Sequence, residues 1–188
     1  MKPLILLDRD GVLNRLVIDP EHGTIDSPLH VSQVELLAGV SEAVAELTRM
    51  GYLLAIVTNQ PAAAKGKTTQ KNLHDTHELI LQKIQERGGI IQSSHFCFHR
   101  SEDGCTCRKP RTGLLEEAIQ LHATQATWMV GDGVTDIQAG AALGISTVFL
   151  GPKKCDACRV FNDFQLKPSF WAENLLEFAQ FLKQTRRQ

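Results

Sequence analysis

The chain has 188 residues, of which 43% are hydrophobic and 22% charged, and its formal net charge is −1. This composition supplies the core of one ordinary domain, and the balanced charge argues against a basic surface for binding nucleic acid. The sequence contains no apolar run of the roughly 18 residues that a membrane-spanning helix needs, and the first apolar run, Leu4–Leu7, is too short for a signal peptide. We therefore expect a single cytoplasmic domain over residues 1–188, monomeric and without a nucleic-acid or membrane partner.

Segments with strand and helix patterns alternate along the chain. The first strand, residues 4–7, is followed by a stretch over 11–34 that is rich in Pro and Gly and predicts a surface flap. Ser41 is the expected N-cap of the first helix. Further strands are predicted at 52–57, 90–98, 128–130 and 145–150, and helices at 41–50, 69–87, 114–121, 136–143 and 171–184. This alternation predicts an α/β fold, a three-layer, doubly wound and mostly parallel sheet of the Rossmann-like kind.

Polar residues stand at the predicted carboxyl ends of several strands. Asp8 and Asp10 follow the first strand and precede a turn at Gly11, a pattern that a simple turn or a calcium loop would also give. Thr58 ends the second strand, Lys109 follows the third, and Asp132 ends the fourth. Since the carboxyl ends of parallel strands share one edge of the sheet, we expect these side chains to meet there.

The chemistry of this set is that of phosphoryl transfer through an aspartyl-phosphate. A carboxylate attacks phosphorus only when a cation offsets its repulsion with the phosphate, and Mg²⁺ held by Asp8, Asp132 and a backbone carbonyl near Asp10 would do so. Lys109 would balance charge on the transferred group, and Thr58 would donate a hydrogen bond to a phosphoryl oxygen.

A second cluster precedes Lys109. Cys97 and His99 form one pair of ligands and Cys105 and Cys107 another, which is the donor set of a closed, tetrahedral zinc site. The alternative is a buried strand cysteine with unrelated loop thiols. With no position left open for water, the Zn²⁺ would be structural and would hold the loop 97–107 in place beside Arg108 and Lys109.

Together these residues resemble the haloacid dehalogenase-like phosphohydrolases, whose four motifs occur in the same order. The resemblance implies that Asp8 is the nucleophile and that Asp10 is the general acid and base. It implies that Asp136 orients Lys109 or a metal-bound water, although an Asp capping the next helix is the simpler alternative. The segments between the motifs hold only the elements that the core itself needs, so we expect no folded cap domain.

The zinc cluster followed by Arg-Lys-Pro resembles two groups of that family. They are the D-glycero-D-manno-heptose 1,7-bisphosphate phosphatases, which act in lipopolysaccharide precursor synthesis, and the histidinol-phosphate phosphatases. The resemblance assigns Arg108 to substrate recognition. The run containing Asn59, Gln60 and Lys65 resembles the heptose group, and we expect these three residues to bind substrate as well, although solvated loop lysines are common. Residues 18–30 match the flap of neither group. We expect a phosphatase for a small phosphorylated sugar or similar metabolite.

Two alternative functions and one unassigned cysteine pair remain at this point. A zinc-stabilised binding module without activity would be expected to lose Asp8, Asp10 or Lys109, all of which are present. A polynucleotide end phosphatase would need a basic surface. The pair Cys155 and Cys158 is either a set of free thiols or a second metal or redox site, because a lone Cys-x-x-Cys is weak evidence.

Overall fold

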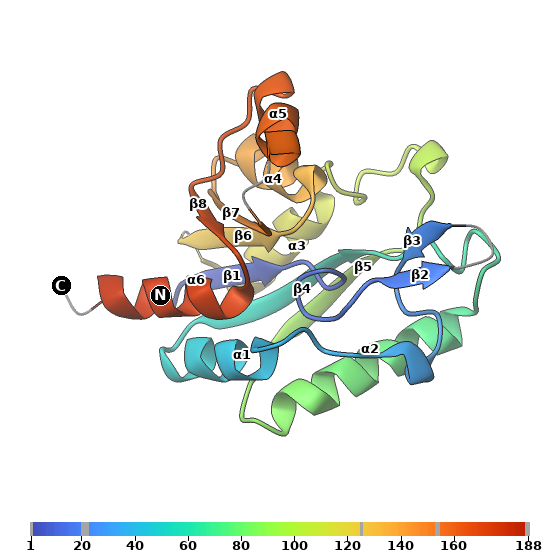
Figure 1. Cartoon of the computed structure of the whole chain (residues 1–188), viewed down its shortest axis with the longest axis horizontal. Coiled ribbons are helices and arrows are strands. Elements are labelled where there is room, and N and C mark those ends of the chain that lie inside the picture. Colours follow the sequence, from blue (N-terminus) through green and yellow to red (C-terminus); the bar gives the residue numbers. More distant parts are fainter. Residues whose placement is uncertain (1, 20–22, 125, 153–154, 187–188) are drawn as a thin grey trace.

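The computed structural model describes residues 2–19, 23–124, 126–152 and 155–186. Its centre is a six-stranded sheet in the order β5-β4-β1-β6-β7-β8, in which every neighbouring pair is parallel (Figure 1). The strands are β1 (Leu4–Leu7), β4 (Leu53–Asn59), β5 (Ser93–Cys97), β6 (Thr127–Gly131), β7 (Ser146–Leu150) and β8 (Phe170–Ala172). The strand order reverses at β1, and such a switch point leaves a crevice at the carboxyl ends of the strands.

Helices cover both faces of the sheet. They are α1 (Val40–Arg49), α2 (Gln70–Gln85), α3 (Gly113–His122), α4 (Val134–Ala142), α5 (Cys155–Asp163) and α6 (Leu175–Thr185). Strand β1 divides its side chains between two cores, because alternate residues of a strand face opposite ways. Ile5 and Leu7 pack with residues of α1, α2 and α6, while Leu4 and Leu6 pack with residues of α3 and α4. The predicted three-layer fold is therefore confirmed.

Three details differ from the sequence prediction. Helix α1 is capped by Gly39, which has a left-handed φ of 77°, and Ser41 lies inside the helix. The predicted helix over 171–184 is two elements, because Phe170–Ala172 pairs in parallel with β7 and Asn174 then caps α6 by accepting from the Glu177 N–H. Helix α5 was not predicted. Among the described helices, none combines the length and hydropathy needed to span a bilayer.

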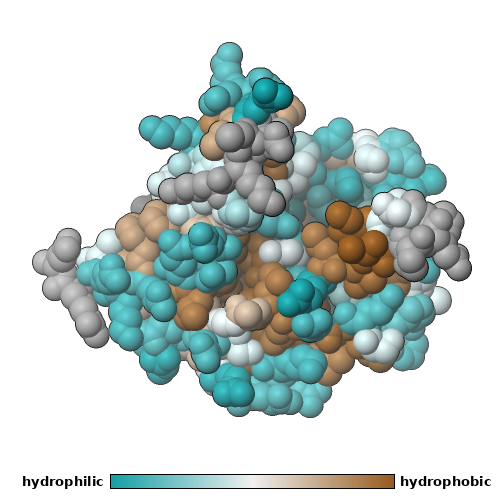
Figure 2. All heavy atoms as spheres, viewed as in Figure 1, coloured by the Kyte–Doolittle hydropathy of each residue, from teal (hydrophilic) through white to brown (hydrophobic). Residues whose placement is uncertain are grey.

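The flap over residues 11–34 contains a small antiparallel hairpin, β2 (Val17–Asp19) and β3 (Thr24–Asp26), and a short 3₁₀ turn at Val31–Gln33. The hairpin carries an apolar surface (Figure 2), since the cross-strand pair Ile18 and Ile25 is 71% and 66% exposed. The Lys67 ammonium pairs with the Asp26 carboxylate at 2.6 Å, which joins the flap to the loop that follows β4. A second short 3₁₀ turn, Ser101–Asp103, lies in the loop after β5.

Candidate active site

Three carboxylates gather where β1 and β6 end. Asp8, Asp132 and Asp136 each place a carboxylate oxygen within 4.8 Å of the others. Gly11 makes this approach possible, because it has a positive φ of 85° and any Cβ there would collide with the Asp132 carboxylate. Oxygen ligands from clustered carboxylates are those that Mg²⁺ prefers in proteins, so the donor set fits this ion.

Lys109 lies among these carboxylates and is 3% exposed. Its ammonium is 2.9 Å from Asp8 Oδ1 and 2.6 Å from Asp136 Oδ1, and it donates to the Val57 carbonyl at 2.7 Å. Burial alone would lower the pKa of Lys109, but the carboxylates of Asp136 and Asp8 outweigh it and hold that pKa above its ordinary value. Lys109 is therefore a buried cation in direct contact with the predicted nucleophile.

The site still carries excess negative charge. Burial raises the pKa of Asp8 to about 6, with Lys109 opposing the rise and Asp136 and Asp10 adding to it. Burial, then repulsion from Asp8 and Asp136, raises the pKa of Asp132 to about 7. A divalent cation bound by Asp8 and Asp132 would relieve this repulsion.

Asp136 makes both contacts that the sequence left as alternatives. Its Oδ1 faces Lys109, and its Oδ2 accepts from the Gly133 N–H at 3.1 Å, which caps α4. The helix cap thus fixes the carboxylate that holds Lys109 in place.

The side chains of Asn59 and Gln60, which we expected to contact substrate, contact protein groups of the site. The Asn59 amide accepts from the Lys109 N–H and donates to the Lys109 carbonyl, each at 3.1 Å, so it clamps the backbone of Lys109. Gln60 is fully buried and donates to the Asp10 carboxylate and, at 2.9 Å, to Thr58 Oγ1. In this structure both amides are bound to protein groups of the site, and their contact with substrate stays a prediction.

The other two expected substrate residues lie on loops. Arg108 is half-buried and donates to the His99 carbonyl at 3.3 Å, and Lys65 is exposed on the loop after β4. A cleft of about 710 Å³ opens on the opposite side, beside Asp132, and is lined mostly by apolar residues, among them Val12, Leu37 and Phe149.

The four predicted zinc ligands come together. Ligand atoms of Cys97, His99, Cys105 and Cys107 all lie within 4.8 Å of one another, and Cys97 Sγ is 3.7 Å from Cys105 Sγ and 3.6 Å from His99 Nδ1. A tetrahedral Zn²⁺ with Zn–S bonds of about 2.3 Å separates its sulfur ligands by roughly 3.8 Å. The Cys97–Cys105 distance matches this value, whereas Cys107 Sγ lies closer, 3.0 Å from Cys97 Sγ and 3.3 Å from His99 Nδ1. The four side chains are therefore gathered as a zinc site requires, and the donor set fits Zn²⁺.

The family follows from comparison with known proteins. Residues 5–144 match the family model described as haloacid dehalogenase-like hydrolase. The chain belongs to the haloacid dehalogenase-like hydrolases. The predicted family and the assignment as an enzyme are confirmed, and the alternative of an inactive binding module is set aside.

This hydrolase also has named relatives. The D-glycero-beta-D-manno-heptose-1,7-bisphosphate 7-phosphatase of Neisseria meningitidis serogroup A is 34% identical over 185 residues, which cover 96% of this chain and 95% of the relative. The histidine biosynthesis bifunctional protein HisB of Legionella pneumophila strain Lens is 32% identical over 148 residues, 78% of this chain but 40% of that protein.

Among solved structures, the D,D-heptose 1,7-bisphosphate phosphatase of B. bronchiseptica, complexed with magnesium and phosphate, is similar to this hydrolase with a TM-score of 0.82. The two are 27% identical, and the match covers 98% of this chain and 99% of the other.

Two residues that contact Asp10 were not anticipated from the sequence. Arg9 and Asn14 are both fully buried and donate to Asp10, although the sequence analysis gave neither a role beside it. The sequence offered one signal for Arg9, which is a charged residue standing between Asp8 and Asp10 directly after a buried strand.

The second cysteine pair of this hydrolase lies on α5. Cys158 is exposed there, and the side chain of its predicted partner Cys155 lies outside the described residues.

Proposed function

We propose that the chain is a Mg²⁺-dependent phosphatase that removes the 7-phosphate of D-glycero-β-D-manno-heptose 1,7-bisphosphate and leaves the heptose 1-phosphate. The observation that carries the proposal is Lys109, buried between Asp8 and Asp136 beside Asp132, because this arrangement offers both a nucleophile and charge compensation for a phosphoryl group. The named relatives support the heptose as substrate.

The reaction would proceed in two steps. The Asp8 carboxylate attacks phosphorus, the bond from phosphorus to the leaving oxygen breaks, and Asp10 gives its proton to that oxygen. Asp10 then takes a proton from water, whose oxygen attacks the same phosphorus and releases inorganic phosphate from Asp8. Lys109 and Thr58 hold the phosphoryl oxygens during both steps.

Mg²⁺, when bound by Asp8, Asp132 and the Asp10 carbonyl, supplies the positive charge that offsets repulsion between the carboxylates and the phosphate. A structural zinc ion at Cys97, His99, Cys105 and Cys107, and action as a single-domain cytoplasmic monomer, complete the proposal. The zinc loop would keep Arg108 beside the substrate.

A second candidate substrate is histidinol phosphate, because a HisB protein is 32% identical over 78% of this chain. Phosphate release should be measured with the heptose bisphosphate, other sugar phosphates, histidinol phosphate and nucleotides, all with Mg²⁺. We expect the heptose bisphosphate to give the highest kcat/KM and Asp8→Asn to lose turnover with every substrate. Wild-type turnover in Asp8→Asn would refute the nucleophile, and a preference for histidinol phosphate would refute the heptose.

A further inference from the structure

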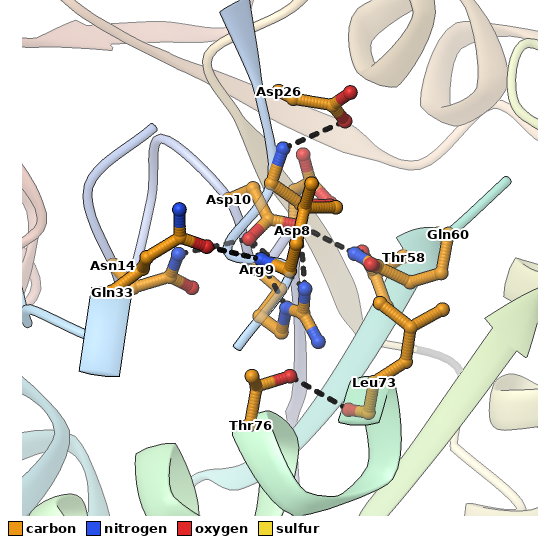
Figure 3. Close-up of polar contacts among 12 residues, drawn as sticks. Asp8, Arg9, Asp10, Asn14, Asp26, Gln33, Thr58, Gln60, Leu73 and Thr76 are labelled. Atoms are coloured by element: carbon orange, nitrogen blue, oxygen red, sulfur yellow. Dashed lines mark hydrogen bonds and ion pairs between the residues drawn. The ribbon is translucent and has the colours of Figure 1, made fainter. Parts of the chain in front are cut away.

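The predicted acid and base, Asp10, lies within a set of buried hydrogen-bond donors (Figure 3). Arg9, Asn14 and Gln60 each have an exposed fraction of 0%. Arg9 donates from Nη2 to Asp10 Oδ2 at 3.0 Å and from Nε and Nη2 to Oδ1 at 3.2 and 3.1 Å. Asn14 donates to Oδ1 at 2.8 Å, and the Gln60 amide donates to Oδ2. Both oxygens of one carboxylate are thereby held by three side chains.

Two of these donors, Gln60 and Asn14, make further contacts besides Asp10. The Gln60 amide also donates to Thr58 Oγ1 at 2.9 Å, and its backbone N–H donates to the Cys97 carbonyl at 2.7 Å. The Asn14 amide also donates to the Arg15 carbonyl at 3.0 Å. Contacts from the loop after β1 and from the end of β4 therefore converge on Asp10.

Burying three polar side chains is unfavourable unless their hydrogen bonds are made, and a core of apolar side chains would avoid that cost. All three side chains instead donate to Asp10. In the proposed reaction this carboxyl group gives up one proton and takes one back in each turnover. General acid and base catalysis depends on the proton donor lying at hydrogen-bond distance from the leaving oxygen and then from water. A carboxylate free to rotate would meet this condition only part of the time.

We propose that Arg9, Asn14 and Gln60 are positioning residues that hold the Asp10 carboxylate in the orientation needed for both proton transfers. The inference rests on the proposed phosphatase chemistry but not on the identity of the sugar. It assigns to Gln60 a role in catalysis through Asp10, in addition to the substrate contact expected from the sequence.

The test uses Gln60→Met, which keeps the length of the side chain and removes its amide. Asn14→Leu is the second variant and Gln92→Met the matched control, because the Gln92 amide bonds to the backbone of Leu54 on the sheet, outside the Asp10 set. Two esters are compared with each protein. β-Glycerophosphate needs a proton on its leaving oxygen, whereas p-nitrophenyl phosphate releases a stable phenolate without one.

We expect Gln60→Met and Asn14→Leu to lower kcat/KM for β-glycerophosphate about 10- to 100-fold, part of the full effect of a general acid, and to lower it far less for p-nitrophenyl phosphate. With the aryl ester the variants should release a burst of about one p-nitrophenolate per chain and then turn over slowly, because water attack on the phosphoryl-enzyme still needs Asp10 as base. Gln92→Met should behave as the wild type does.

Equal losses of kcat/KM with both esters, or slow turnover without a burst, would overturn the proposal, since either result describes general damage to the site. Failure of both variants to fold, when Gln92→Met folds, would also overturn it, because the donors would then serve the fold. A wild type that cleaves both model esters but not the heptose bisphosphate would refute the proposed substrate alone and leave this test intact.

Discussion

Replacing Lys109, the buried cation of the candidate active site, tests how strongly its ammonium stabilises the neighbouring carboxylates of Asp8 and Asp136. In Lys109→Met the stem of the side chain is preserved and the ammonium is lost. Asp8 and Asp136 then face each other without the charge that lies 2.9 Å from one and 2.6 Å from the other, and the Val57 carbonyl loses its donor. The variant therefore leaves uncompensated acceptors in a site where Lys109 is 3% exposed.

Breaking a buried ion pair by deleting one partner costs about 3 to 5 kcal/mol of unfolding free energy, and we expect Lys109→Met to lose an amount in this range. Lys71→Met is the matched control. Lys71 pairs with Asp75 at a similar distance, 2.6 Å, but its side chain is 81% exposed. An exposed pair of this kind is worth at most about 1 kcal/mol. The two variants should therefore differ because Lys109 is buried and has two carboxylate partners, whereas Lys71 is exposed and has one.

The assay is urea unfolding near neutral pH without added Mg²⁺, applied to Lys109→Met, Asp136→Asn and the double variant. Since both single changes remove the same contact, the double variant should be more stable than the sum of the single losses predicts, by about 2 kcal/mol. Losses that add to within about 0.5 kcal/mol would refute the reasoning, because Lys109 and Asp136 would then contribute independently. Lys109→Met should also lower kcat at least about 100-fold, because the charge next to the phosphoryl group is gone.

Three further predictions address the rest of the molecule. The purified protein should hold about one zinc ion per chain, measured by atomic emission. The variant Cys107→Ser should lose this ion, whereas Cys158→Ser, at an exposed cysteine outside the cluster, should keep it. Gly11→Ala should abolish turnover by displacing Asp132, whereas Gly88→Ala, with a similar positive φ of 81° and no described atom within 4 Å of its Cβ, should lose only about 1 kcal/mol of stability. Burial, and then Arg9, lowers the pKa of His77 from 6.5 to about 4, so the folded state takes up this proton later than the unfolded state as pH falls. His77 should therefore contribute about 3 kcal/mol of stability above pH 6.5 that is lost by about pH 4, while the raised pKa values of Asp8 and Asp132 act in the opposite direction. The difference in unfolding free energy between the wild type and His77→Leu, measured with urea, should change by about 3 kcal/mol over this range; an unchanged difference would contradict the prediction.

The sheet and its site edge could be predicted because hydrophobic strands and polar strand ends are local features. Four of the six sheet strands, β1, β4, β6 and β7, contain apolar runs, and the parallel arrangement then brings Asp8, Thr58 and Asp132 to one edge. Strand β8 was missed for a physical reason. Phe170–Ala172 has only three residues, and it is a strand because β7 offers an unpaired edge, which the local pattern does not reveal.

The roles of Asn59 and Gln60 show where a motif stops being informative. Residues two apart on a strand share a face, so the periodicity of β4 already places Gln60 with Thr58 and Asn59 on the other side. The structure agrees, since Gln60 bonds to Thr58 while Asn59 clamps Lys109. The sequence does not reveal that both amides bind protein groups. Their partners, Asp10 and Lys109, are about 50 residues away and meet them only in the folded chain.

Asp8 and Asp10 are equivalent in the sequence and differ entirely in their surroundings. Asp8 faces Lys109, Asp132 and Asp136, a group whose unbalanced negative charge fits a metal ion and a phosphate. Asp10 instead faces the buried guanidinium of Arg9, with which it forms an ion pair at 3.0 Å, and the buried amides of Asn14 and Gln60. Two carboxylates placed in different environments can perform different chemistry at one pH, one as nucleophile and the other as proton carrier. The division of roles that the family resemblance implies would therefore rest on the loop after β1, which turns at Gly11 and directs the two side chains to separate sets of partners.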